Sequence, residues 1–265
     1  MRRARFPAYS AAVLGAIATM CVIVPLFTRG ATRMNFDAFM MPPSAAHWFG
    51  TDPLGRDLFL MICHGGRVSL HVGLLATVFA TLIAMVYGAA AGLAGETADA
   101  LLMRAVELLL SVPSILYVVT IQAILGAPSP TSIAVVIGLT SWMNMAKMIR
   151  AEVLRVRRTE YVLSALHMGG GFMYVLGRHL LPNFVPAILF MVVSNVGSAI
   201  AAEATLSFMG IGLPATVVSW GSLMSLSQNA LLTGKWWMIL IPGLFLVTAL
   251  VCVTNIGEYY RKINR

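Results

Sequence analysis

The chain has 265 residues, of which 59% are hydrophobic and 11% charged, whereas a typical soluble domain carries about 25% charged residues. Its mean hydropathy of +0.85 excludes an ordinary soluble core and indicates a membrane protein. The net charge of +8 raises the possibility of a nucleic-acid partner, but the basic residues flank apolar runs and do not form one soluble basic face. No nucleic-acid partner is therefore expected.

A membrane-spanning helix needs about 20 apolar residues to cross about 30 Å of hydrocarbon. In lipid, every backbone polar group must be bonded within its own segment, so helices are the only plausible spans at this length. We therefore predict an all-α, polytopic membrane protein, with Pro113, Pro128 and Pro130 interrupting its third and fourth spans. The apolar runs predict about six transmembrane helices, at residues 8–27, 68–94, 101–125, 130–148, 183–210 and 236–257.

The amino terminus carries Arg2, Arg3 and Arg5 before its first apolar run, a pattern also found in secretory signals. No small-x-small cleavage site follows, so an uncleaved first span is expected. With both termini in the cytoplasm, 13 of the 18 basic residues lie on the cytoplasmic side, as the positive-inside rule requires. They are Arg2, Arg3, Arg5, Arg104, Lys147, Arg150, Arg155, Arg157, Arg158, Arg178, Arg261, Lys262 and Arg265.

This topology places residues 28–66 and 211–235 outside the cell, with Cys63 in the first of these two loops. The TDPLGRD stretch of the first loop has a turn signal at its Asp-Pro pair and carries charges of both signs. We expect an ordered external cap built on Asp52, Arg56 and Asp57. Contact with another protein and closure of the chain's own external face both stay open as roles.

A basic interruption between the fourth and fifth spans reads as two short helices joined by glycines. Three consecutive glycines from Gly169 favour a turn, because residues without Cβ lose the most backbone entropy in a helix. Residues 172–181 can form the second helix, which Pro182 stops because it has no N–H. On the inner face of a membrane protein, such a unit is either a docking element or a connector.

Glu203 is a carboxylate within the fifth predicted span, beside small residues such as Ala201 and Ala202. Because an ionisable group is costly in hydrocarbon, Glu203 is a candidate for the translocation path together with Ser207. The alternative is a hydrogen-bonded packing residue between closely approaching helices. Glu107, near the inner face, is expected to pair with Arg104 at i,i+3 spacing.

Enzymatic chemistry is not expected in this chain. The sequence contains no nucleophile elbow, no phosphate-binding glycine loop followed by Lys-Ser/Thr and no paired-carboxylate site. Its five histidines lack metal-ligand spacing, so no metal site is predicted. If transport consumes ATP, another chain must bind the nucleotide.

The chain contains six motifs in the order HWFGTDPLGRDLF (47–59), GGRVSLHVGL (65–74), MRAVELLLSVPS (103–114), RHLLPN (178–183), ATLSFMGIG (204–212) and SWGSLM (219–224). In this order they resemble permease subunits of ABC importers, in the branch that handles dipeptides, oligopeptides, nickel and related metal chelates. The resemblance implies a type I importer permease fold, with an amino-terminal helix and loop at 1–66 and the permease domain at 67–265. It also implies a bacterial inner (plasma) membrane location.

The family's partners would be a homologous second permease, two cytoplasmic ATPase subunits and an extracytoplasmic substrate-binding protein. ATP and Mg would bind the ATPases, leaving no cofactor in this chain. ATP-driven closure would move a coupling helix, which tilts the spans and opens the pore to each side in turn. The binding protein is then the other protein that the external cap could contact.

The family's ATPase-docking "EAA" loop corresponds to residues 158–182 here. Its Glu-Ala-Ala positions carry Leu163, Ser164 and Ala165, so the expected glutamate is missing, and Glu160 lies one turn earlier. The docking set implied by the resemblance is Glu160, Leu163, Ser164, Ala165, Leu166, Gly169, Gly170, Leu181 and Pro182.

An ion-coupled secondary transporter is the alternative function, with Glu203 as its ion carrier. That class is expected to show inverted repeats with broken helices, and the two halves of the sequence show no convincing repeat. An importer permease that couples to a separate ATPase is the reading that the sequence favours.

Overall fold

The computed structural model describes residues 6–28, 33–157, 159–160, 168–169, 181–214 and 216–263, with the backbone alone at 181–187. The described residues form helices joined by loops, so the all-α prediction is confirmed. The long helices are α1 (Ala8–Phe27), α2 (Leu58–Leu93), α3 (Glu96–Leu110), α4 (Ser114–Leu125), α5 (Pro130–Ser141), α6 (Met143–Arg157), α9 (Leu181–Phe208) and α11 (Trp237–Ile263). The short ones are η1 (Phe36–Ala38), α10 (Trp220–Leu226) and η3 (Gln228–Ala230).

The spans of this chain are of two kinds, single helices and bent pairs of helices. Among the described residues, α1, α2, α9 and α11 are each long and apolar enough to cross a membrane alone. The pairs α3–α4 and α5–α6 pass the same test together, bent by 83° and 47° at short breaks. Six predicted spans therefore correspond to four straight helices and two bent pairs. Pro113 stands at the first break, since it lacks an N–H and disfavours helix at the residue before it.

The second span begins earlier than the hydropathy predicts. Helix α2 starts at Leu58, where the Asp57 carboxylate accepts hydrogen bonds from the backbone N–H groups of Phe59 and Leu60 at 3.0 and 3.2 Å. The first loop therefore ends at residue 57 and not at 66, and Cys63 is a fully buried residue of α2 rather than a loop residue. The polar run around His64 lowers the local hydropathy, but its glycines are buried against other helices.

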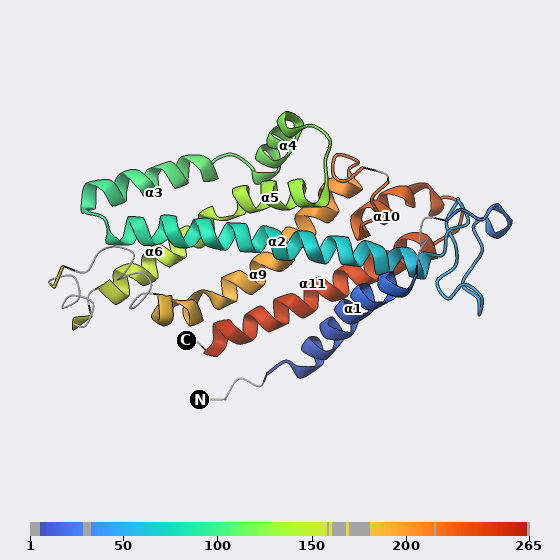
Figure 1. Cartoon of the computed structure of the whole chain (residues 1–265), viewed down its shortest axis with the longest axis horizontal. Helices are drawn as coiled ribbons and strands as arrows, with labels where there is room; N and C mark the ends of the chain where they lie inside the picture. Colours follow the sequence, from blue (N-terminus) through green and yellow to red (C-terminus); the bar gives the residue numbers. More distant parts are fainter. Residues whose placement is uncertain are drawn as a thin grey trace.

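The described parts of the two predicted external loops lie at one end of the molecule, and the start of α1 and the end of α11 lie toward the other (Figure 1). The start of α1 meets the end of α11, where the Asn255 amide donates to the Ser10 hydroxyl at 3.1 Å and the rings of Phe6 and Tyr259 lie 5.2 Å apart. Helix α6 ends toward this side, while residues 33–57 and α10 lie toward the other. This arrangement agrees with the predicted grouping of the loops.

Helix α2 runs through the centre of the fold and contacts α1, α5, α6 and α9 (Figure 1). Small residues four apart line the face of α2 that meets α6, and all of them are buried: Ala80, Ala84, Gly88 and Gly92. A Cβ on Gly88 would lie only 2.6 Å from the carbonyl oxygen of Ala146. Small residues at this spacing let helix backbones approach closely in membranes.

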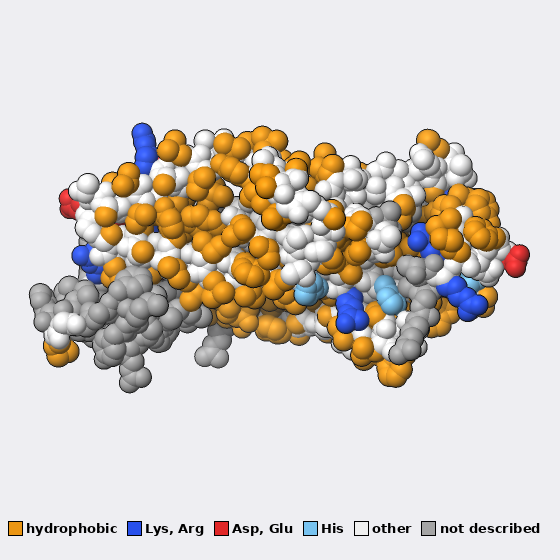
Figure 2. Space-filling model, turned by 45° about the horizontal axis from the view of Figure 1, so that its top comes forward, with side chains coloured by type: hydrophobic (Ala, Val, Ile, Leu, Met, Phe, Trp, Pro, Cys, Tyr) orange, Lys and Arg blue, Asp and Glu red, His pale blue; other side chains and the backbone are white. Residues whose placement is uncertain are grey.

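Hydrophobic side chains cover the middle of the face shown in Figure 2, and most charged side chains lie toward its two ends. This distribution suits a body whose middle lies in hydrocarbon. The distribution of side chains on this face therefore agrees with the membrane prediction made from the composition.

Candidate functional site

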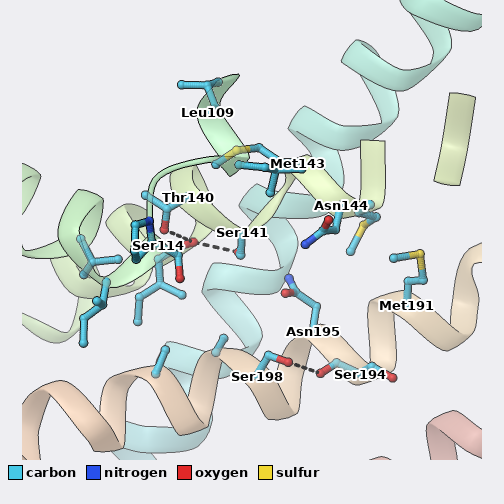
Figure 3. Close-up of a pocket in the computed structure, with 18 of the residues that line it drawn as sticks. Leu109, Ser114, Thr140, Ser141, Met143, Asn144, Met191, Ser194, Asn195 and Ser198 are labelled. Carbon is cyan, nitrogen blue, oxygen red and sulfur yellow. Dashed lines mark hydrogen bonds between the residues drawn. The ribbon is translucent and has the colours of Figure 1, made fainter. Parts of the chain in front are cut away.

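A cavity of about 740 Å³ lies where the two bent pairs meet α9 (Figure 3). The α3–α4 break lines the cavity with Val112, Pro113 and Ser114, and the α5–α6 break does so with residues on both sides of Trp142. Non-helical backbone at membrane depth is tolerated where it lines a cavity. Both breaks therefore open onto one space.

The cavity wall mixes apolar side chains with neutral polar ones. No charged side chain is found among the described residues that line it. A wall without fixed charge selects neither cations nor anions by long-range attraction. Its polar members are Ser114, Thr140, Ser141, Asn144, Ser194, Asn195, Ser198 and Thr205.

Most of the hydroxyls on the wall already donate within their own helices. The Ser198 hydroxyl, for example, donates to the carbonyl of Ser194 at 3.2 Å, and Thr205 donates to Ala201 at 2.8 Å. The amide nitrogen of Asn195 is different, because it is buried and has no hydrogen-bond partner among the described residues. Asn144 is exposed on the first turn of α6, and the two amides point toward one another in Figure 3.

Neither asparagine was among the site residues predicted from the sequence. Both lie inside predicted spans, in the runs SWMNMAKM and MVVSNVGS. A search for uncharged amides at membrane depth, as well as for charged residues, would have found them. The sequence does not show that they line one cavity, because the hydropathy pattern does not contain the bend at Trp142.

Glu203 lies away from this cavity, where α9 packs against α2 and α10. Its side chain is fully buried, and its carboxylate accepts hydrogen bonds from the hydroxyls of Ser69 and Ser207 at 2.9 and 2.8 Å. Neither Glu203 nor Ser207 lines the cavity wall. The carboxylate thus joins α2 and α9 within the fifth predicted span.

Helix α10 completes the surroundings of Glu203. The Ser69 hydroxyl accepts the backbone N–H of Trp220 at 3.3 Å, and the Ser207 hydroxyl accepts that of Leu213 at 3.3 Å. The Trp220 ring is itself buried, and its Nε1 donates to the carbonyl of Ile62 at 3.1 Å. Glu203 therefore belongs to a polar network that links α2, α9 and α10.

The TDPLGRD stretch forms a tight turn in front of α2, as its turn signal predicted. The Asp52 carboxylate accepts the backbone N–H groups of Leu54 and Arg56 at 2.8 Å each and pairs with the Arg56 guanidinium at 2.6 Å. Both charged side chains are almost fully buried. Asp57 caps α2 and contacts His47 at 2.8 Å. All three predicted residues thus stabilise the cap itself.

The predicted docking segment lies mostly outside the described residues. Leu163, Ser164, Ala165, Leu166 and Gly170 fall there, and Glu160 is described and exposed.

Gly169 stands in a turn with a φ of +82°, which is the left-handed region that favours glycine. Leu181 and Pro182 occupy the first turn of α9. There a proline is well tolerated, because the first N–H groups of a helix have no partner within it.

Helix α6, which leads into that segment, is tied to α3 by an ion pair. The Arg150 guanidinium donates through both Nε and Nη2 to the two carboxylate oxygens of Asp99, each at 2.5 Å. Arg157 donates to the carbonyls of Gly92 and Ala94 at 3.3 and 3.1 Å, at the end of α2. Helix α3 of one bent pair is therefore joined to helix α6 of the other. The expected Arg104–Glu107 pair is also present, at 3.6 Å and exposed.

Comparison with known proteins gives a consistent result. The family described as "Binding-protein-dependent transport system inner membrane component" matches residues 84–262. The dipeptide transport system permease protein DppC of Bacillus subtilis is 35% identical over 90% of this chain and 75% of its own length. The oligopeptide permease protein OppC of the same organism is 35% identical over 91% and 77%. The probable D,D-dipeptide permease protein DdpC of Escherichia coli is 31% identical over 96% and 85%.

Proposed function

Because this chain belongs to the family of binding-protein-dependent transport system inner membrane components, we propose that it is a permease subunit of an ATP-driven peptide importer. In this proposal it supplies half of a translocation pore in the bacterial inner membrane, and a homologous second permease supplies the other half. The observation that carries the proposal is the neutral, partly polar cavity at the two helix breaks, within a protein whose relatives are named as peptide permeases.

Peptides are the proposed solute class because the three relatives compared above carry peptide transport in their names. The uncharged cavity wall also suits solutes of varied side-chain charge. Nickel or a metal chelate is the other solute class that the sequence resemblance implied.

The decisive experiment is uptake into proteoliposomes that contain this chain, its partner permease, the ATPases and the binding protein. We expect ATP-dependent accumulation of labelled di- or oligopeptides and none of ⁶³Ni. Accumulation of nickel alone would overturn the solute assignment.

ATP and Mg would bind two separate ATPase subunits, which dock on the 158–182 segment. The proposal is supported by the position of this segment, directly after α6, which is tied to α3 and to the end of α2. Movement of the ATPases would then tilt α3 and α6.

The substitution Ala165→Asp tests the docking role, because an unpaired charge in an apolar groove costs about 3–5 kcal/mol. We expect loss of the ATPases from the purified complex. The matched control is Leu232→Asp, an exposed leucine of the 211–235 loop, which should leave the complex intact. Normal ATPase recovery with Ala165→Asp would contradict the docking assignment.

Both termini and the 158–182 segment are proposed to face the cytoplasm, and residues 28–57 the exterior. The common end shared by the start of α1 and the end of α11 supports this orientation, together with the positive-inside pattern. Single cysteines at Thr159 and Trp48, in a cysteine-free background, test it. Impermeant maleimide added to intact cells should label position 48 only. Labelling at position 159 would show that the chain has the opposite orientation.

The external cap is proposed to receive the substrate-binding protein. Its support is the rigid turn built by Asp52 and Arg56, beside which several apolar side chains, among them Phe36 and Trp48, are exposed. A Trp48→Ala variant should weaken stimulation of ATP hydrolysis by the binding protein. Unchanged stimulation would mean that the cap does not contact the binding protein.

A secondary transporter driven by Glu203 is not favoured. The Glu203 carboxylate is fully buried, accepts two hydroxyl hydrogen bonds from this chain and does not line the cavity. Peptide uptake that persists in proteoliposomes with a proton gradient and no ATP would reinstate that alternative.

A further inference from the structure

We infer that the side-chain amides of Asn144 and Asn195 form a binding site for the peptide backbone of the solute. This inference rests on the proposed function, since it assigns the recognition chemistry of the same cavity. It begins from the buried Asn195 nitrogen, which has no hydrogen-bond partner among the described residues. An unpaired buried donor is unfavourable, and a ligand acceptor that enters the cavity removes this penalty.

The second contribution comes from the opposite wall. Asn144 projects from the first turn of α6 toward Asn195 of α9 (Figure 3). Each side-chain amide offers one acceptor oxygen and two N–H donors. A peptide group offers the complementary C=O acceptor and N–H donor, so two amides on facing walls can hold one peptide group between them.

The remaining wall explains why the backbone, rather than a side chain, would be recognised. The described lining residues carry no charge, so they provide no partner for charged termini or charged side chains. Apolar residues such as Leu109, Ile137 and Met191 surround the amides and can accommodate solute side chains of different shape. Among the polar features that free peptides share, the peptide group is the one without charge.

The position of Asn144 also connects the site to the movement of α6. It lies two residues after Trp142, where α5 and α6 meet at a 47° bend, and on the helix that leads to the 158–182 segment. The Asp99–Arg150 pair makes α3 follow α6. A tilt of α6 about this bend would move Asn144 relative to Asn195, which would release the peptide group when the ATPases change state.

The test uses the reconstituted complex with its binding protein. The probes are dialanine and trialanine, each compared with the analogue in which trans alkenes replace the peptide groups, which lacks both their C=O and their N–H. The same binding protein serves all variants, so a change in the uptake ratio between probe and analogue comes from the permease. Loss of one or two hydrogen bonds should lower uptake of the unmodified peptides about three- to tenfold in Asn195→Ala.

Uptake of the alkene analogues should change less than twofold in the same variant, so that the discrimination between probe and analogue collapses. Asn144→Ala should behave likewise, and because Asn144 is exposed this variant also serves if Asn195→Ala fails to assemble. The matched control is Thr254→Ala on α11, outside the cavity wall, whose hydroxyl already donates to the carbonyl of Leu250. Its uptake of both probes should stay within twofold of the wild type.

Three results would overturn the inference: unchanged uptake in both asparagine variants, an equal loss for the unmodified peptides and their alkene analogues, or loss of the partner permease from both variants. The last result would mean that the amides pack at the interface between the two permeases. Uptake by the wild-type complex tests the importer proposal separately from the asparagine site. A wild-type complex that takes up no peptide, or takes it up without ATP, would overturn the importer proposal first and the inference with it.

Discussion

Two buried polar regions of this protein differ in whether their hydrogen-bonding groups have partners. Where the straight helices α2 and α9 meet α10, Glu203 is fully buried and accepts two hydroxyl hydrogen bonds from the same chain. Where the bent pairs meet α9, Asn195 keeps a buried N–H without a partner among the described residues. The first arrangement stabilises the fold, and the second leaves capacity for a ligand.

The same contrast extends to the backbone. Helix α2 is unbroken and buries one face, because small residues such as Gly88 let α6 approach its backbone. The α3–α4 pair is broken at Pro113 and exposes much of its surface. Close packing therefore fixes the straight helices in place, while the breaks are where a change of angle costs least contact. Four substitutions test this comparison, in order of decreasing effect on the free energy of unfolding.

The largest effect is expected from Arg56→Ala, at the start of the straight helix α2. The substitution leaves the buried carboxylate of Asp52 without its cation, which costs about 3–5 kcal/mol when one partner of a buried pair is removed. Thermal unfolding of the detergent-purified protein measures the change. Arg33→Ala, at an exposed position of the same loop, is the control and should stay within about 0.5 kcal/mol of the wild type. Equal midpoints for the two variants would mean that the cap does not stabilise the fold.

Gly88→Val should be the next most damaging change, because it drives α2 away from α6. Its Cβ would lie 2.6 Å from the backbone carbonyl oxygen of Ala146, which cannot move aside as a side chain can. Overpacking of this kind typically costs about 1–3 kcal/mol. Gly15→Val in α1 adds the same atoms where no heavy atom lies within 4 Å of the new Cβ, so it should unfold like the wild type. A stable Gly88→Val protein would show that α6 is only loosely held against the straight helices.

Glu203→Gln should have a small effect, of at most about 1 kcal/mol, because glutamine keeps the shape and can still bond the two serine hydroxyls. Glu203→Leu removes both acceptors and should cost about 1–3 kcal/mol. Thermal midpoints of the two variants, together with ATP-dependent uptake, make the comparison. Uptake abolished by Glu203→Gln at an unchanged midpoint would place the carboxylate in transport and contradict its packing role.

Arg104→Ala should have the smallest effect, since it removes an ion pair from the surface of a bent pair. Arg104 and Glu107 are 3.6 Å apart and their side chains are 77% and 51% exposed. Exposed pairs contribute little, so the change should be below about 0.5 kcal/mol. The same unfolding measurement checks it, and a loss comparable to that of Arg56→Ala would show that this helix surface is covered in the protein as purified.

Much of the architecture follows from the sequence alone. Hydropathy predicted six membrane crossings, because burial of apolar side chains in lipid depends on composition over a window of residues and not on particular neighbours. Local chemistry predicted the turn at Asp52 and the interruption at Pro113, since both act through the backbone within a few residues. Six ordered motifs were enough to indicate the family, which the comparisons confirm.

Tertiary structure decided the rest. The start of α2 at Leu58 depends on glycines that are favourable in a helix only because other helices pack on them. The surroundings of Glu203 depend on Ser69, which lies 134 residues away in the sequence. Asn144 and Asn195 line one cavity although they lie on two helices, α6 and α9, and α6 is set off from α5 by a 47° bend. A one-dimensional pattern records which residues avoid water, but the partners of a buried polar group are set by which helices the fold brings together.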